Sequence, residues 1–207
     1  MTRDEICARI LAAPLRPNRR LIAVVGPPGS GKSTFAGQLA DDLAHAGQTV
    51  QIVPMDGFHL DNRLLDARGL RAQKGAPQTF DAAGVLRLVH ALQDPEGVVY
   101  PLFDRDRDIA IAGAGYAPAD CDTVLVEGNY LLFDAPIWRD LATRWSLSIA
   151  LTPPPEVLQA RLVQRWLDHG LSAQDAARRA NDNDMKNADL VVQHMLPADL
   201  TLSETPQ

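Results

Sequence analysis

The clearest chemistry in this sequence lies in a glycine-rich segment. Residues 26–34 have the sequence GPPGSGKST and match the spacing GxxxxGK(S/T) in full, directly after an apolar run and directly before an amphipathic one. Glycines let the backbone curl so that successive N–H groups point at phosphate oxygens, and the start of a helix adds a favourable field for negative charge. We therefore predict a loop that binds the phosphates of a nucleoside triphosphate, formed by Gly26, Pro27, Pro28, Gly29, Ser30, Gly31, Lys32, Ser33 and Thr34.

Side chains of three kinds complete the chemistry expected around this loop. Lys32 would reach the β- and γ-phosphates, and the Ser33 hydroxyl would bind Mg²⁺. Asp56 follows the predicted strand 49–54 in VPMDGFH, so it would lie across from the loop as the base that accepts the proton of an attacking hydroxyl. A turn-forming aspartate is the alternative. Glu127 ends the buried run TVLVE and is placed for an outer-sphere contact with the metal, or it is a structural acid.

The elements that must hold these groups alternate between strands and helices. Short apolar runs rich in β-branched residues predict strands, and apolar residues at helical spacing predict helices. We predict strands over 21–25, 49–54, 98–103, 123–127, 147–151 and 190–192, helices over 33–46, 82–93, 135–144, 155–168 and from Ser172 onward, and loops over 55–79 and 104–115. This order predicts an α/β protein with a mostly parallel sheet and helices on both faces, whose ligands bind at the carboxyl ends of the strands.

Composition limits the domain organisation and the partners. The chain has 207 residues, 46% of them hydrophobic, which predicts one domain over residues 1–196; residues 197–207 are expected to form a disordered tail. A net charge of −6 argues against a nucleic-acid or membrane partner, and no apolar run reaches membrane-spanning length. Two cysteines far apart in the sequence and the lack of a secretory signal predict a cytoplasmic protein. A homodimer is compatible with these observations.

A phosphate loop alone does not separate kinases from GTPases, transport ATPases or remodelling enzymes. The NKxD stretch that usually gives guanine specificity does not occur, and neither does the LSGGQ signature of transport ATPases. Both absences favour a kinase that uses ATP. The rival hypothesis is an ATP-hydrolysing switch that acts on a protein partner, which would need a way to position water instead of an acceptor pocket with a base.

Six segments together resemble the P-loop kinases that include uridine kinase, phosphoribulokinase and bacterial pantothenate kinase. They are GPPGSGKST at 26–34, MDGFH at 55–59, KGAPQTFD at 74–81, PLFDR at 101–105, VEGNYLL at 126–132 and RLVQR at 161–165. The resemblance implies the three-layer P-loop NTPase fold, ATP and Mg²⁺ as cofactors, Asp56 as the base and Glu127 near the Mg²⁺. It also implies a lid over roughly 155–186, whose Arg161 and Arg165 close on the phosphates. A solvated helix face with ion pairs is the alternative for these arginines.

The expected activity is transfer of the γ-phosphate of ATP to a hydroxyl group of a small metabolite. Loops above the strand ends offer polar and aromatic side chains for the acceptor pocket, namely His59, Arg63, Lys74, Phe80, Asp104 and Arg105. Each of them could equally be an ordinary salt-bridged or structural residue. Short bacterial proteins similar to this chain are often labelled nucleoside or fructose kinases, so a sugar, a nucleoside and a pantothenate-like acceptor all stay open. The sequence also leaves open whether Lys186 and Asn187 belong to the site.

Overall fold

A five-stranded parallel sheet forms the centre of the computed structural model, which describes residues 1–203. The strands run in the order β2-β5-β1-β6-β7, and every neighbouring pair is parallel. Their bounds are Arg20–Val25 for β1, Val50–Pro54 for β2, Thr123–Gly128 for β5, Leu147–Leu151 for β6 and Leu200–Leu202 for β7. The prediction of a mostly parallel sheet is confirmed.

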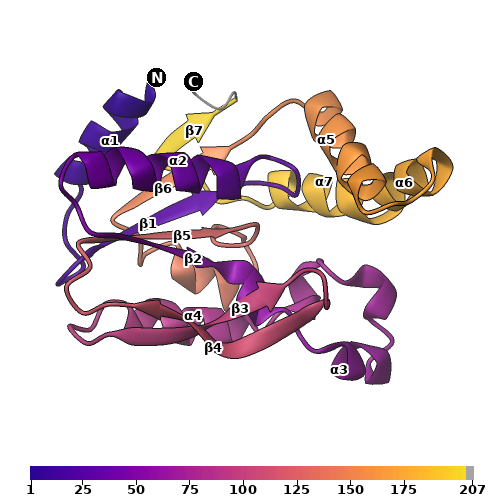
Figure 1. The fold of residues 1–207 in the computed structure, drawn as a ribbon, viewed down its shortest axis with the longest axis horizontal. Helices are drawn as coiled ribbons and strands as arrows, with labels where there is room; N and C mark the ends of the chain where they lie inside the picture. The colour runs from indigo at the N-terminus through magenta and orange to yellow at the C-terminus, as the bar shows by residue number, and fades with distance from the viewer. Residues whose placement is uncertain (204–207) are drawn as a thin grey trace.

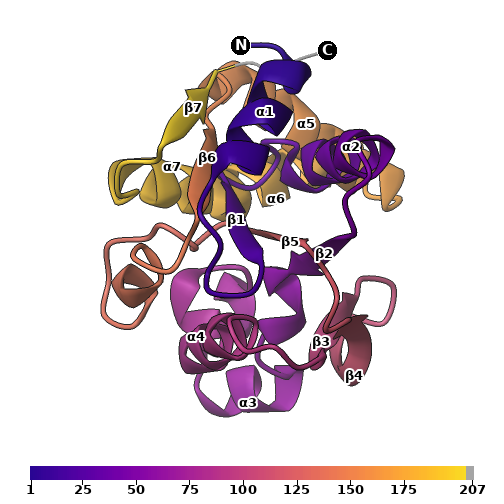
Figure 2. The same ribbon diagram turned by 90° about the vertical axis from the view of Figure 1, so that its left-hand side faces the viewer.

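The two faces of the sheet carry separate hydrophobic cores, because successive side chains of a strand point to opposite faces. In β1, Leu21, Ala23 and Val25 pack into one core, whereas Ile22 and Val24 pack into the other. Helices α1 and α2 contribute to the core of Ile22 and Val24, and α4 and α7 contribute to the opposite core (Figures 1 and 2). The helix bounds are Arg3–Ala12 for α1, Lys32–His45 for α2, Ala82–Ala91 for α4 and Met185–Gln193 for α7. The predicted three-layer arrangement is therefore present.

A β-hairpin lies apart from the main sheet. Within the described residues, β3 (Val98–Asp104) and β4 (Ile109–Ala117) pair only with each other, in an antiparallel ladder. Tyr100 links the hairpin to the main sheet, because its hydroxyl donates a hydrogen bond to the carbonyl of Ile52 in β2 at 3.0 Å. The loop predicted over 104–115 is therefore wrong for most of its length, since β4 finds its hydrogen-bond partners on β3.

Short helical turns occupy the segment between β2 and α4, where the sequence predicts an irregular loop. They are η1 (Met55–Phe58), α3 (Asn62–Ala67), η2 (Arg71–Gln73) and η3 (Pro77–Thr79). Residues 74–80, which we call the Lys74 loop, lead to the start of α4. Asp81 caps α4, because its Oδ1 accepts a hydrogen bond from the N–H of Gly84 at 2.8 Å.

The segment predicted as a lid follows β6 and stands to one side of the sheet (Figure 1). It contains α5 (Pro155–Asp168), α6 (Ala173–Arg179) and a π-helical segment, η5 (Ala180–Asp184), which continues directly into α7. Single π-helical turns inside α-helices are rare and are frequent at functional sites. No helix in residues 1–203 combines the length and the apolar character needed to cross a membrane.

The helix predicted over 135–144 is wrong in its extent. Only one 3₁₀ turn forms there, η4 (Trp138–Leu141). Ile137, directly before it, has a φ of 72°, a left-handed conformation that a helix cannot contain. Helix α1 is a further difference, because the sequence analysis predicts no element there.

The C-terminal region also differs from the prediction. The strand predicted over 190–192 is wrong, because these residues belong to α7. The prediction of a disordered tail over 197–207 is wrong for β7, which pairs with β6 and buries Leu200 and Leu202. Two leucines at alternate positions, directly after Asp199, are the signal of this edge strand. Residues 204–207 lie outside the described residues.

Candidate active site

The phosphate loop connects β1 to α2 in a conformation that depends on glycine. Gly29 and Gly31 have φ angles of 78° and 90°, in the left-handed region that other residues rarely adopt. Gly31 is also the residue before α2, so the free N–H groups of the first helical turn are next to the loop. A Cβ on Gly26 would lie 2.6 Å from the carbonyl oxygen of Leu151, so a side chain there would collide with the backbone. The predicted loop has the setting that phosphate binding requires.

Lys32 folds back over this loop. Its ammonium donates hydrogen bonds to the carbonyl of Pro27 at 3.0 Å and to the hydroxyl of Ser30 at 3.4 Å, and the residue is only 8% exposed. Burial lowers the pKa of Lys32, and the negative charges of Glu127 and Asp56 act in the opposite direction. The structure therefore places Lys32 close enough to Glu127 and Asp56 for their charges to interact.

Ser33 and Glu127 meet beside the loop. The Ser33 hydroxyl donates a hydrogen bond to Oε1 of Glu127 at 3.1 Å. Glu127 is buried because β5 lies next to β1, and burial raises its pKa, while the charge of Lys32 partly opposes this. A hydroxyl and a carboxylate are oxygen ligands of the kind that Mg²⁺ prefers, and Mg²⁺ usually takes its remaining ligands from water and phosphates. No group of three or more His, Cys, Asp or Glu side chains that could hold a metal occurs in residues 1–203.

Asp56 lies in η1, directly after β2, and is paired with an arginine from the hairpin. Its Oδ2 accepts a hydrogen bond from Nη2 of Arg105 at 2.7 Å. The side chain of Asp56 is 23% exposed and that of Arg105 is 58% exposed, so the pair is open to solvent on one side. Asp56 and Arg105 both influence the pKa of Lys32, which places the candidate base near the phosphate loop.

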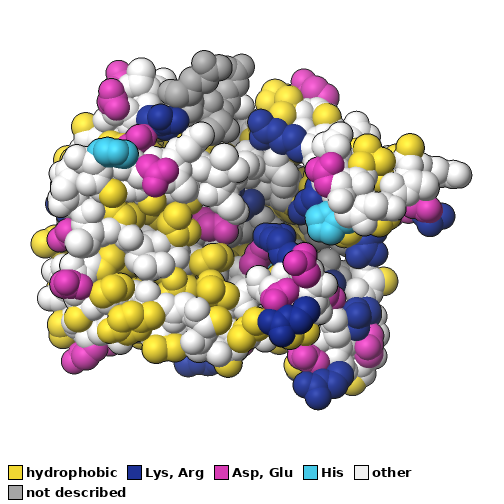
Figure 3. All heavy atoms as spheres, viewed as in Figure 1, with side chains coloured by type: hydrophobic (Ala, Val, Ile, Leu, Met, Phe, Trp, Pro, Cys, Tyr) yellow, Lys and Arg dark blue, Asp and Glu magenta, His cyan; other side chains and the backbone are white. Residues whose placement is uncertain are grey.

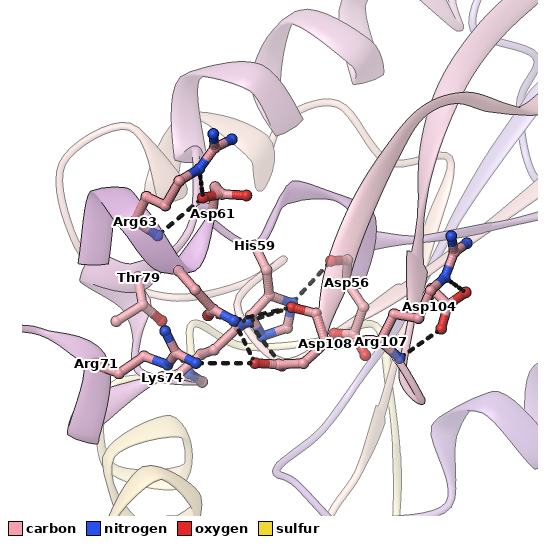
Figure 4. Close-up of polar contacts among 12 residues, drawn as sticks. Asp56, His59, Asp61, Arg63, Arg71, Lys74, Thr79, Asp104, Arg107 and Asp108 are labelled. Atoms are coloured by element: carbon pink, nitrogen blue, oxygen red, sulfur yellow. Dashed lines mark hydrogen bonds and ion pairs between the residues drawn. The ribbon is translucent and has the colours of Figure 1, made fainter. Parts of the chain in front are cut away.

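His59 is held between two aromatic rings beside Asp56. Its ring centre lies 4.0 Å from that of Phe80 and 4.6 Å from that of Phe103. Nδ1 of His59 lies 2.8 Å from the backbone carbonyl oxygen of Asp56, so this nitrogen carries a hydrogen and donates it (Figure 4). Burial lowers the pKa of His59, which favours the neutral ring. The three rings form an apolar wall next to the candidate base.

Lys74 is fixed by the turn of the hairpin. Its ammonium donates hydrogen bonds to Oδ1 of Asp108 at 2.8 Å and to Oδ1 of Asn62 at 2.7 Å. It also lies 5.0 Å from the centre of the Phe103 ring, within the range of a cation–π contact. Figure 4 shows Lys74 and Asp108 meeting next to His59. Lys74 therefore holds the hairpin turn against the Lys74 loop.

Two of the predicted pocket residues lie away from this cluster. The side chain of Arg63 is 93% exposed and pairs with Asp61 at 2.9 Å. Asp104 pairs with Arg107 inside the hairpin turn at 2.8 Å. Figure 4 shows these two pairs on opposite sides of the central group. The structure brings together the other four predicted residues, His59, Lys74, Phe80 and Arg105.

Both predicted lid arginines lie near the phosphate loop. Nη1 of Arg161 donates a hydrogen bond to the carbonyl of Ser30 at 3.2 Å. Nη2 of Arg165 donates to Oδ2 of Asp184, in η5, at 3.2 Å, and the charge of Arg165 influences the pKa of Lys32. Because both guanidinium groups are engaged with protein atoms, their closure on phosphates stays a prediction.

The sequence analysis did not assign three residues to the site that the structure places there. Asp108 is 34 positions from Lys74, and the hairpin that brings it there is not predicted. Asp184 is 6% exposed and accepts two hydrogen bonds from α5, although its NDND context suggests a solvated segment. Tyr130 donates its hydroxyl to the carbonyl of Gly75 at 2.6 Å. The sequence signal that could have identified Asp184 is a polar residue on the stripe of a helix that is expected to be buried.

A hollow opens between the lid and the segment just before the Lys74 loop, whereas Asn183 of the lid bonds the carbonyl of Lys74 directly at 3.2 Å. Figure 3 shows Lys and Arg side chains gathered on this side of the molecule. A cavity of about 620 Å³ opens there, lined by Ala72 of η2 and by residues of α6 and η5, among them Arg178 and Arg179. The lining also includes Asp175 and Asp182, and Arg178 pairs with Asp175 at 2.7 Å, so the two arginines are balanced by two aspartates.

Comparison with known proteins places the chain in a family. A solved structure from Silicibacter sp. TM1040, called a "putative fructose transport system kinase", is 55% identical and has a TM-score of 0.94, covering 98% of this chain and 99% of that one. The "Putative uridine kinase C227.14" of Schizosaccharomyces pombe is 32% identical over 212 residues, which cover 97% of this chain and 90% of that protein. The uncharacterized protein YggC of Escherichia coli is 33% identical over 200 residues, 93% of this chain and 81% of that protein.

No family model matches the chain. The likeness to these relatives nevertheless extends over almost its full length. A pantothenate kinase of Leifsonia xyli is also 33% identical over 161 residues, 70% of this chain and 48% of that protein. The resemblance inferred from the six sequence segments is confirmed, and the chain belongs to the P-loop small-molecule kinases of the uridine kinase and pantothenate kinase group.

Proposed function

We propose that this kinase transfers the γ-phosphate of Mg·ATP to a hydroxyl group of a small metabolite, with Asp56 as the base. The proposal rests on the position of Asp56, which follows β2, bonds His59 through its backbone carbonyl and acts on Lys32 of the phosphate loop through the charge of its carboxylate. Phosphoryl transfer asks the protein mainly to position the reactants and to neutralise charge. An acceptor pocket with its own carboxylate supports a kinase over a hydrolytic switch.

Each polar group of the site has one task in this proposal. Asp56 orients the acceptor hydroxyl and takes its proton as the new O–P bond forms. Lys32 neutralises negative charge on the β- and γ-phosphates, while Ser33 and Glu127 hold Mg²⁺, which supplies further positive charge there. Arg165 adds its charge from the lid after it has left Asp184. Closure of the lid also excludes the water that would otherwise hydrolyse ATP.

Arg105 must release Asp56 before this carboxylate can act as a base. The two side chains form a partly exposed ion pair, 2.7 Å long, and the side chain of Arg105 is 58% exposed. Exposed ion pairs contribute about 0–1 kcal/mol, so an acceptor hydroxyl can compete for the carboxylate. The released guanidinium stays at the mouth of the pocket, where it can contact other polar groups of the acceptor.

The acceptor class follows from the pocket and from the names of the relatives. His59 and Phe103 are half-buried and their rings are tilted against each other, so together they offer an apolar surface that suits a sugar or a base. We place D-fructose first, because the relative that is 55% identical carries the name of a fructose transport system kinase. Uridine and pantothenate come next, for the relatives named after them.

The test is ADP release from Mg·ATP with D-fructose, uridine, pantothenate or ribulose 5-phosphate as the added acceptor. Asp56→Asn should abolish the release that depends on the acceptor. Asp106→Asn is the matched control, because Asp106 makes the same charge change on the exposed hairpin turn, next to Arg105; it should keep activity. ADP release that is independent of every acceptor and survives in Asp56→Asn would support the hydrolytic switch instead.

A further inference from the structure

One polar side chain interrupts the buried stripe of α7. Asp184, Asn187 and Val191 recur at helical spacing and are all buried, and Val191 packs into the core on one face of the sheet. Asp184 is satisfied by its two hydrogen bonds from α5. Asn187 is 6% exposed, at a position where this stripe would ordinarily hold an apolar residue.

The side-chain amide of Asn187 makes no hydrogen bond with residues 1–203, whereas its neighbour Asn183, one turn earlier, donates one to the carbonyl of Lys74 at 3.2 Å. Buried amides are almost always paired, because an unpaired one loses its bonds to water without replacement. The Asn187 amide is also not among the unpaired polar atoms that are sealed from water. It therefore reaches space that a solvent molecule or a ligand can enter.

That space adjoins the Lys74 loop. A Cβ on Gly75 would lie 3.7 Å from Nδ2 of Asn187, so the amide faces the backbone of Gly75. The carbonyl of Gly75 is taken by the hydroxyl of Tyr130 at 2.6 Å, and its N–H is taken by Oγ1 of Thr79 at 3.0 Å. Burial raises the pKa of the Tyr130 hydroxyl, and the negative charge of Asp56 acts in the same direction. A short path thus leads from Asn187 past Gly75 and Tyr130 to the candidate base.

Because the Asn187 amide bonds none of the described residues and is not sealed from water, a water molecule or a ligand has to supply its partner. We propose that Asn187 is an acceptor-binding residue, whose amide hydrogen-bonds a hydroxyl group of the acceptor. An amide suits a hydroxyl because both can donate and accept. A site built this way discriminates strongly against an analogue that lacks the hydroxyl, since the buried amide is then left unpaired. This inference rests on the proposed function.

The first measurement needs no acceptor. Asn187→Leu replaces an unpaired buried amide with an apolar group of similar size, so the ligand-free variant should melt at the same temperature as wild type or higher. Asn183→Leu makes the same chemical change one turn away but removes a hydrogen bond to Lys74, so it should melt lower. A drop in Asn187→Leu as large as that in Asn183→Leu would show that the amide already has a protein partner and would overturn the inference.

The second measurement uses the probe among D-fructose, uridine, pantothenate and ribulose 5-phosphate that supports ADP release by wild type. Asn187→Leu should raise KM for that probe about tenfold or more, as expected for a lost hydrogen bond in a buried site, with KM for ATP within about twofold. An unchanged KM for the acceptor, or a rise in the KM for ATP instead, overturns the acceptor role of Asn187 and leaves the proposed kinase function standing. If wild type turns over none of the probes, the proposed function itself fails, and the acceptor role of Asn187 fails with it.

Discussion

Lys32 and Glu127 are two buried charges whose interaction can be measured. They are 8% and 6% exposed. Burial lowers the pKa of Lys32 and raises the pKa of Glu127, and for each residue the charge of the other is the largest influence that opposes burial. At neutral pH each charge therefore destabilises the folded protein by itself and relieves the other. We predict that the effects of Lys32→Met and Glu127→Gln on stability are not additive.

The contacts of Lys32 and Glu127 determine how large the coupling free energy between the two substitutions should be. Removing one member of a directly bonded buried pair costs about 3–5 kcal/mol. Here Lys32 has a nearer partner in the carbonyl of Pro27 and Glu127 has one in the hydroxyl of Ser33, so the interaction is weaker. We expect the double variant to be more stable than the sum of the single effects by about 1–3 kcal/mol, within the range of such couplings.

Thermal unfolding of wild type, the two single variants and the double variant, all without nucleotide, measures this coupling. A change of 1 kcal/mol in stability shifts Tm by about 2–4 °C for a chain of this size. Lys186→Met, on an exposed lysine, is the matched control and should show no coupling with Glu127→Gln. Because the pKa of Glu127 is raised, its protonated form favours the folded state; this contribution is present at low pH and is lost as pH rises through the folded pKa. Additivity within about 0.5 kcal/mol at neutral pH would show that the two charges do not stabilise each other.

Two further predictions concern the acceptor pocket and the lid. Burial lowers the pKa of His59, so wild type should lose stability as pH falls below about 6.5, the pKa of histidine in the unfolded chain. His59→Phe should lose less stability over the same range. Equal changes in Tm for the two proteins between about pH 7.5 and about pH 5.5 would contradict this prediction. Arg165→Ala should lower kcat about 100-fold while the Kd for Mg·ATP changes little, because its charge is needed mainly in the transition state. Single-turnover kinetics with a titration of ATP binding tests this, and an unchanged kcat would show that Arg165 serves only to bind Asp184.

The central sheet could be predicted from the sequence because its signals are local. The run LIAVV followed by GPPGSGKST gives a buried strand, a phosphate loop and the start of α2 within a few residues. Strand β4 could not be predicted in the same way, since IAIAGAGYA contains two glycines and becomes a strand by pairing with β3. Likewise, β7 is a three-residue edge strand that depends on β6 for its hydrogen bonds.

The same distinction between local signals and tertiary contacts applies to the candidate site. Asp56 and Glu127 could be predicted because each follows or ends a buried strand, and parallel strands bring their carboxyl ends to one edge of the sheet. The ion pair of Asp56 could not be predicted, because its partner comes from an element placed by tertiary contacts. Arg105 reaches Asp56 from the hairpin turn, and Asn187 reaches the Lys74 loop from α7. Spacing rules do not specify such contacts between distant segments.

The identity of the phosphorylated product distinguishes transfer to an acceptor from hydrolysis of ATP. Phosphorus-31 NMR of the enzyme with Mg·ATP and D-fructose, and then with each of the other three acceptors, separates a phosphorylated acceptor from inorganic phosphate. We expect that, with one of these acceptors, a phosphomonoester signal grows in step with ADP, and that Asp56→Asn loses this signal while Asp106→Asn keeps it. Inorganic phosphate as the sole product in all four reactions, formed equally by wild type and Asp56→Asn, would contradict the account.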